Sequence, residues 1–497
     1  MPNRPSRLRF PLPARGALRV AAATFVLSLA TGCALLPEPT ASEVQAQAMG
    51  RVTVPPNWSA EASAAQVNDG WLASFNDPTL SRLVYEALEN NPDLWIAAAR
   101  LEQANAQVDI AEAQLKPAIG ILGRSGNKPV SDLVALFSGV MLRLSWEIDL
   151  WGRMRYARNA ARAGRDATSA DYRFAQQSLA AGVARAWFVA SEARLQRELA
   201  TEMVDSARGL VDLSQHREQV GAGSTSEVLA ARANLSAYED SQQQVDLAYR
   251  QALRALELLL GRYPGAQLSA SETLTPFPGP IPAGIPMDVL NRRPDMVAAE
   301  RRVAAAFDRV GEAKAAMLPA ISLSAGYGRI SSDALETRGD LEDTTASIAA
   351  TGVAPIYTGG AMTGHVALRT AEQKAAVADY ARRALVALGE VEDALNAERV
   401  LIERERILEA SAAASRDVTR LERDAYRVGK SDLRAVNQRL LAQHAAEVAL
   451  LHVRRERLVR RVDLHLALGG NFGTAPVPAD ANPAAPGPAD SNPETVQ

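Results

Sequence analysis

Side chains that could carry out chemistry are few in this chain, and their spacing does not favour catalysis. The sequence has no Gly-x-Ser-x-Gly motif, no phosphate-binding loop, no His-Glu-x-x-His motif and no pair of cysteines. His444 and His452 lie about two turns apart on one predicted helix, too far for both to bind one metal ion. The other histidines are isolated: His216, His365 and His465. We therefore predict that the protein is not an enzyme and has no catalytic site, metal site or cofactor.

The only cysteine, Cys33, follows a segment that is typical of a bacterial export signal. Residues 1–32 contain no acid and combine an apolar run over 20–30 with five arginines: Arg4, Arg7, Arg9, Arg15 and Arg19. The run Leu-Ala-Thr-Gly-Cys at 29–33 resembles a lipobox, in which the cysteine is lipidated and becomes the mature N-terminus. We expect a signal peptide over 1–32 and a covalent lipid on Cys33, rather than a stray cysteine in an ordinary signal peptide. Since residue 34 is not aspartate, the usual bacterial sorting rule places such a lipoprotein in the outer membrane.

The rest of the composition argues against nucleic acid as a partner and against transmembrane helices. Removal of residues 1–32 changes the formal net charge from −3 to −8, because five arginines leave with them, and an acidic chain binds nucleic acid poorly. No later segment has the roughly 18 consecutive apolar residues of a transmembrane helix. If the mature chain crosses a membrane, it must do so as strands of a closed barrel.

Prolines divide the chain into two similar halves. Pro92 opens one predicted helix, and Pro294 opens its equivalent 202 positions later. The prolines that end these helices, Pro117 and Pro319, are also 202 positions apart. Each half has the pattern of a helix, two strands, a long helix, a break and a helix. The predicted organisation is a lipidated segment over 33–79, repeats over 80–261 and 293–470, a linker over 262–292 and a disordered tail over 471–497.

The long helices are predicted from the absence of proline and from apolar periodicity. The stretch from Arg153 to about Arg217 has no proline, which predicts a helix about 100 Å long at 1.5 Å per residue. Leu195, Leu199 and Met203 recur every four residues along one face of it. This stripe predicts that the helices pack side by side.

Two strand candidates, over 140–149 and 321–328, alternate apolar with mostly polar or small residues. The pattern is that of a strand between lipid and water, and a strand on a soluble core would look the same. Glu147 and Asp149 are interpreted as charges that line a lumen rather than as an acid–base pair. Two strands in each half give four in the chain, too few to close a membrane barrel, which needs about eight or more. A membrane-spanning chain would therefore be an oligomer, and three copies would supply twelve strands.

Four ordered stretches of the sequence carry a resemblance to a known family. They include WLASFNDPTL at 71–80, SWEIDLWGR at 145–153, IPAGIP with RRPD between 281 and 295, and PIYTGG at 355–360. With the segments that follow them, they cover the chain from about 70 to 470. The chain resembles the TolC-type outer-membrane factors, specifically the NodT-type lipoproteins of resistance–nodulation–division efflux systems.

This resemblance implies a fold that is mainly α with a small β part, in an internally duplicated chain. Three chains would form a 12-stranded outer-membrane β-barrel joined to a long periplasmic α-helical barrel. The implied function is the outer-membrane channel of a tripartite efflux pump, a passive exit duct for drugs or other small molecules. Its partners would be two further copies of the chain, a periplasmic adaptor, an inner-membrane resistance–nodulation–division pump and outer-membrane lipid, but not nucleic acid.

The resemblance also places a site at two periplasmic turns, which we expect at the breaks over 220–226 and 428–432. Glycines suit such turns, where positive backbone angles are needed. In the family these tips meet the adaptor and close the pore. The residues expected to contact the adaptor are Gly221, Gly223, Gly429 and Ser431.

The candidate gate residues are Tyr426, Arg427 and Asp432. Many relatives carry Leu-Asp-Ala-Gln-Arg just after the second turn, with the aspartate near the gate. This chain has Ala-Val-Asn-Gln-Arg at 435–439, and its turn looks about two residues shorter. Val436 or Asn437 therefore holds the place of the aspartate, and Asp432 is the candidate that could supply the charge. The alternative is that all three candidates are ordinary surface residues at a helix end.

Other functions remain open on the sequence alone. A duct for metal ions or for secreted protein is hard to exclude, because a wide tunnel does not select strongly. A periplasmic coiled-coil adaptor or scaffold would also be a lipoprotein with helical hairpins. It would need lipoyl-like and β-barrel domains with many short strands, whereas this sequence offers four strand candidates.

Overall fold

The computed structural model describes residues 36–473 except 51, 61–64, 66, 68, 125–136, 280 and 333–342. The predicted signal peptide, Cys33 and nearly all of the predicted tail lie outside the described residues. The chain divides into two compact units. Unit 1 comprises 1–56, 92–175 and 286–389, and unit 2 comprises 57–91, 176–285 and 390–497.

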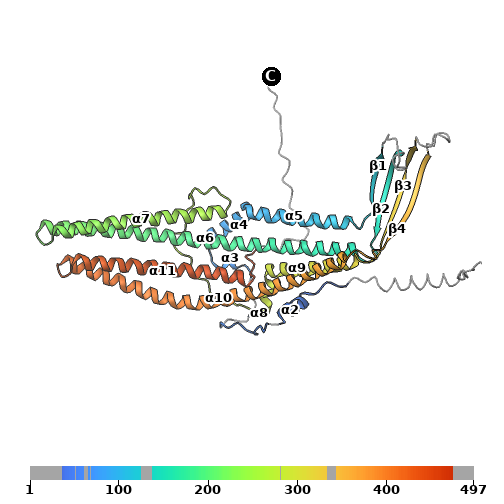
Figure 1. The fold of residues 1–497 in the computed structure, drawn as a ribbon. Coiled ribbons are helices and arrows are strands. Elements are labelled where there is room, and N and C mark those ends of the chain that lie inside the picture. Colours follow the sequence, from blue (N-terminus) through green and yellow to red (C-terminus); the bar gives the residue numbers. More distant parts are fainter. Residues whose placement is uncertain are drawn as a thin grey trace, which may run out of the picture. The chain divides into compact units, whose positions relative to one another are not determined.

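The two halves of the chain have the same order of elements (Figure 1). The first half contains α5 (Pro92–Ala113), β1 (Ala118–Arg124), β2 (Phe137–Ile148), α6 (Arg153–Gln219) and α7 (Thr225–Leu259). The second contains α9 (Pro294–Ala315), β3 (Ala320–Ser332), β4 (Asp343–Val353), α10 (Ala361–Arg427) and α11 (Leu433–Ala467). Within the described parts of the chain, four shorter helices accompany them: α2 (Ala41–Met49), α3 (Trp71–Ser74), α4 (Pro78–Asn90) and α8 (Pro286–Arg292).

Equivalent helices have equal lengths. α5 and α9 have 22 residues each, α6 and α10 have 67, and α7 and α11 have 35. The fold is therefore mainly helical with a small β part, as predicted. Among the described helices, none is long and apolar enough to cross a membrane.

The strands of unit 1 form one antiparallel sheet in the order β1-β2-β3-β4 (Figure 1). The register pairs Leu142 with Tyr327 and Ala325 with Ile348, so alternate residues of all four strands share a face. That face is mostly apolar and accessible, with Arg329 as a charged residue near one end. Its exposed large hydrophobic side chains are Ile119, Ile121, Val140, Leu142, Trp146, Tyr327 and Ile348. The opposite face carries mostly small or polar residues, among them Arg143, Ser145, Ser324, Gly326 and Ser347. The sheet thus has one face suited to lipid and one suited to water.

Two acids, which we interpret as lumen charges, lie where β2 passes into α6. The Asp149 carboxylate follows the strand and accepts hydrogen bonds at 3.0 Å from the backbone N–H groups of Met154 and Arg155. It thereby caps the first turn of α6, where a negative charge is favourable. Glu147 forms an ion pair with Arg153 at 2.8 Å. These residues therefore fix the point at which the strand passes into the long helix.

The core of unit 2 gathers around α3, α4 and the middle of α6. Trp71, Phe75 and Phe188 are buried there, together with Leu458 and Val462 of α11. The ring of His465 stacks on Trp71, with centroids 5.7 Å apart. Burial, and then the nearby charge of Arg461, lowers the pKa of His465 to about 3, so this histidine is a neutral core residue.

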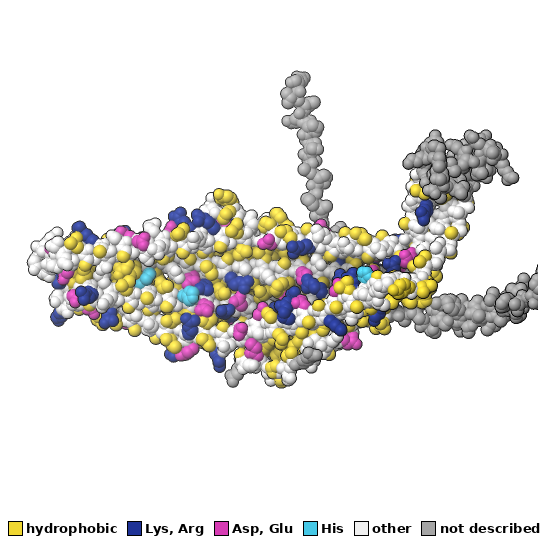
Figure 2. Space-filling model, viewed as in Figure 1, with side chains coloured by type: hydrophobic (Ala, Val, Ile, Leu, Met, Phe, Trp, Pro, Cys, Tyr) yellow, Lys and Arg dark blue, Asp and Glu magenta, His cyan; other side chains and the backbone are white. Residues whose placement is uncertain are grey.

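The surfaces of the helices are charged but mixed in sign. Figure 2 shows acidic and basic side chains interspersed along them, and many are neighbours on one helix, such as Arg406 and Glu403 at 2.6 Å. Pairs at this spacing are usual on solvated helix faces and contribute little each.

Candidate functional site

The two predicted turns lie in unit 2, between α6 and α7 and between α10 and α11. Gly221 and Gly429 adopt positive φ angles of 73° and 77°. Each glycine ends its helix in the same way, because a backbone N–H one residue further on donates to the last helical turn. These bonds are Ala222 N to Arg217 O and Lys430 N to Ala425 O, both 2.8 Å. The turns therefore need glycine at these positions for backbone reasons alone.

Gly223 and Ser431 occupy the equivalent place in the two turns but do different things. Gly223 has no positive φ angle, so the expected backbone reason does not apply to it. A Cβ atom there would lie 3.1 Å from Cβ of Arg217 and 3.2 Å from Oε2 of Glu227, so the position is tight. Ser431 hydrogen-bonds through its hydroxyl to the carboxylate of Glu422.

Asp432 caps α11. Its carboxylate accepts a hydrogen bond from the backbone N–H of Ala435 at 2.8 Å. Ser224 holds the same position before α7, where its hydroxyl accepts from the N–H of Glu227 at 3.3 Å. Each turn has five residues between its helices, 220–224 and 428–432. Within one chain, the visible role of Asp432 is therefore to start a helix.

Tyr426 and Arg427 are neighbours in sequence but point into different surroundings. Tyr426 is fully buried, in a cluster that includes Met203 of α6 and Val436 of α11. Burial, and then the nearby charge of Glu227, raises the pKa of Tyr426, so its ring stays neutral. Arg427 is exposed and forms an ion pair at 2.8 Å with Asp424, three residues earlier on the same helix. The structure thus brings Tyr426, but not Arg427, into contact with the first pair of helices.

Arg217, near the end of α6, is the residue of this site that sequence reasoning missed, because it contacts Tyr426. Its guanidinium lies over the ring of Tyr426, 4.7 Å from the ring centroid. Nη1 donates to the backbone carbonyl of Tyr426 at 2.9 Å, and Nη2 donates to that of Ala222 at 3.0 Å. We call Arg217, Ala222 and Tyr426 the tip clasp, because they join the end of α10 to the α6–α7 turn. A basic residue in the last turn of a helix is a known capping signal, but the sequence does not identify its partner.

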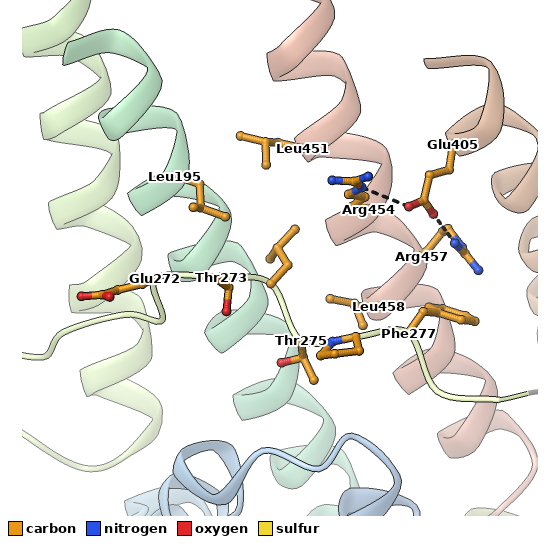
Figure 3. Close-up of a pocket in the computed structure, with 12 residues that line it drawn as sticks. Leu195, Glu272, Thr273, Thr275, Phe277, Glu405, Leu451, Arg454, Arg457 and Leu458 are labelled. Atoms are coloured by element: carbon orange, nitrogen blue, oxygen red, sulfur yellow. Dashed lines mark hydrogen bonds and ion pairs between the residues drawn. The ribbon is translucent and has the colours of Figure 1, made fainter. Parts of the chain in front are cut away.

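A cavity of about 430 Å³ lies in unit 2 where the segment 272–277 crosses α6 and α11 (Figure 3). Arg457 lies over the ring of Phe277 at 3.9 Å, and both Arg457 and Arg454 are paired with Glu405. Arg454 also pairs with Glu409 at 2.9 Å, so two acids balance these two cations. Figure 3 shows the two guanidinium groups turned toward Glu405, so the arrangement is better explained as the attachment of the inter-repeat segment than as a substrate site.

Comparisons with known proteins agree with this architecture. The family described as outer membrane efflux protein matches residues 83–262 and 285–470. The antibiotic efflux pump outer membrane protein ArpC of Pseudomonas putida is 30% identical, over 92% of this chain and 95% of that protein. The cation efflux system protein CusC of Escherichia coli O6:H1 is 27% identical, over 90% of this chain and 98% of that protein.

A solved structure shows the same likeness. The outer membrane channel CmeC of Campylobacter jejuni superposes with a TM-score of 0.76 and 25% identity. The match covers 88% of this chain and 94% of that one. The predicted resemblance to TolC-type outer-membrane factors, the predicted class of function and the predicted outer-membrane location are thereby confirmed. On the evidence of its repeated helices and strands and of these matches, the chain belongs to the outer membrane efflux protein family.

Proposed function

We propose that three copies of this chain form a channel through the outer membrane, which serves as the exit duct of a tripartite efflux pump. The observation that carries the proposal is the open four-stranded sheet of unit 1. Its apolar face is exposed, as at Ile121 (76%) and Ile348 (90%), and β1 and β4 are edge strands. Such a sheet needs lipid on one face and further strands at its edges. Three copies would supply both edges and give the expected 12-stranded barrel.

In this proposal the long helices form the periplasmic tunnel. A lipid on Cys33 anchors each chain, and a periplasmic adaptor meets the turns that contain Gly221, Gly223, Gly429 and Ser431. An inner-membrane resistance–nodulation–division pump supplies the energy and the substrate, and the duct itself catalyses nothing. ArpC is named for antibiotics and CusC for cations, so the relatives leave both drugs and metal ions as substrate classes. We favour small organic molecules, because ArpC is the more similar of these two relatives.

Single-channel conductance and native mass together test the proposed trimeric channel. The purified lipoprotein in a planar lipid bilayer is expected to give small, stable conductance steps, and its native mass is expected to be that of a trimer. Small steps follow if the turns hold the periplasmic end of the tunnel nearly closed. A monomeric mass together with no conductance at any voltage would contradict the channel and bring the scaffold alternative forward.

The two faces of the sheet give a second prediction. Ile348→Arg places a charge on the apolar face and should cost about 2–4 kcal/mol if that face meets the bilayer core. Ser347→Arg is the matched control, because Ser347 is the adjacent residue of β4 and lies on the opposite face. The amount of trimer in the outer-membrane fraction should fall sharply for the first variant and stay near wild type for the second. Equal losses for the two variants would contradict the proposed orientation of the sheet.

A further inference from the structure

One buried acid has no role in the proposed channel. Asp308 lies on α9 and is fully buried, with 0% of its surface exposed. Apart from the carboxyl group of Glu38, no group that the structure describes hydrogen-bonds to either of its carboxylate oxygens. Burial of a carboxylate without other partners destabilises the folded protein, so the environment of Asp308 calls for an explanation. The neighbour within hydrogen-bond reach is the carboxyl group of Glu38, in the segment that leads into α2.

Among the residues that the structure describes, no cation acts on the Asp308 carboxyl group. From α9, the charged group that senses Glu38 is another acid, Glu300, which is itself paired with Arg301 at 3.5 Å. From α6, the hydroxyl of Tyr156 contacts the same segment at Leu36. Two arginines of α6 bind other acids: Arg155 binds Asp149, and Arg162 binds Glu112. Burial, and then the charge of Glu38 and a hydrogen bond with it, raises the pKa of Asp308 to about 7.

The segment that carries Glu38 is held on both sides of this acid. Before it, the backbone N–H of Leu36 donates to the hydroxyl of Tyr156 at 3.0 Å. The Tyr156 ring lies so close to α9 that a Cβ atom on Gly311 would be 2.5 Å from it. After it, Val44 and Met49 of α2 are buried in a cluster with residues of α8, α9 and α10. The two carboxyl groups therefore meet where the segment between these anchors crosses α9.

We propose that Glu38 and Asp308 share one proton and form a pH-sensitive latch that fastens segment 36–40 to α9. Two carboxyl groups in contact are favourable when one of them is protonated and repel each other when both are ionised. Since Cys33 is five residues before Glu38, the latch would fix the chain close to the expected lipid. It would hold the start of the mature chain firmly at acidic pH and loosely at alkaline pH.

The direction and range of the effect follow from linkage. The pKa of the Asp308 carboxyl is raised from its ordinary value of 3.8 to about 7, by burial first and then by Glu38. Docking of segment 36–40 supplies the part of this shift that comes from Glu38, so the docked state binds the proton more tightly. The latch is strongest below the lower value, weakens as pH rises between the two, and changes no further above about 7. Each pH unit inside that window is worth up to about tenfold in the docking equilibrium. Between about pH 5 and pH 8 the expected loss is therefore up to about 100-fold.

Hydrogen–deuterium exchange of the full-length lipoprotein tests this directly. After correction for the pH dependence of chemical exchange, the protection of segment 36–40 should fall up to about 100-fold from about pH 5 to pH 8. In Asp308→Asn and in Glu38→Gln an amide can donate to the remaining carboxylate, so protection should stay nearly constant with pH. Glu43→Gln is the matched control: it weakens the cap of α2 but should keep the wild-type pH dependence, because the pKa of Glu43 is already lowered by its bonds to Thr40.

Three results would overturn the latch. One is wild-type protection that does not change with pH, and another is an undiminished change in both amide variants. The third is recovery of wild-type protection at about pH 8 on addition of calcium or magnesium ions and its loss on chelation. That result would mean that the two carboxylates bind a divalent cation instead of a proton.

Discussion

Replacing Arg217 with alanine should raise the open fraction of the reconstituted channel by at least about tenfold. The guanidinium holds the end of α10 by a cation–π contact with Tyr426 and a hydrogen bond to its backbone carbonyl, while its second hydrogen bond, to Ala222, stays within the α6–α7 hairpin. A cation–π contact contributes about 1–2 kcal/mol where it is desolvated, and hydrogen bonds from a charged donor contribute about 1.5–3 kcal/mol. Even half of this sum is a tenfold change in an equilibrium. If the channel opens when the end of α10 leaves α6, the loss of the tip clasp favours the open state.

Single-channel recording of two arginine variants separates this effect from a general loss of positive charge. Arg427→Ala is the matched control, because Arg427 is exposed and its ion pair is with Asp424 of its own helix. We expect this control to conduct within about twofold of wild type, whereas Arg217→Ala should show frequent, larger openings. Arg217→Lys should lie between them, since lysine keeps the charge but loses the planar fork. Similar conductance for Arg217→Ala and Arg427→Ala would show that the tip clasp does not control the opening of the channel.

The sequence was most informative where local chemistry decides the structure. The long proline-free stretch from Arg153 predicted a helix to about Arg217, and α6 ends at Gln219. Gly221 and Gly429 were predicted as turn residues because a positive φ angle favours glycine, and both have one. The alternation over 140–149 predicted β2 up to Ile148, and only Asp149 falls outside the strand. Each of these features depends on residues that are close together in the chain.

Features that depend on contacts between distant segments could not be predicted in this way. Arg217 and Tyr426 lie on helices whose neighbours are set by packing, so nothing near either residue indicates the other. Arg427 looked equally suitable as a gate residue. It follows the buried Tyr426 by one position on α10, so its side chain points in a different direction, toward solvent. Asp308 looks like any acid on a charged helix until the segment that carries Glu38 covers it. Helical periodicity predicts which residues share a face, but it does not predict which element packs against that face.

Gly261→Ala should be among the most destabilising single-methyl additions in unit 2. Gly261 follows the end of α7 with a φ angle of 72°, which alone costs a non-glycine residue about 1 kcal/mol or more. A Cβ atom there would also lie 2.3 Å from the backbone carbonyl oxygen of Asn90, at the end of α4. Because that oxygen belongs to the backbone, α4 or α7 must shift, and overpacking of this kind costs about 1–3 kcal/mol more. The expected loss is therefore about 2–4 kcal/mol.

The same substitution at Gly221 isolates the contact from the backbone angle. Gly221 has a φ angle of 73°, nearly that of Gly261, but nothing lies within 4 Å of the position that its Cβ would take. Gly221→Ala should therefore lower the free energy of unfolding only by the conformational term of about 1 kcal/mol. Thermal unfolding of both purified variants, followed by circular dichroism, should show a clearly larger fall in midpoint for Gly261→Ala. Equal falls would mean that the junction of α4 and α7 yields to the added methyl group, so that the close packing against Asn90 contributes little to the stability of unit 2.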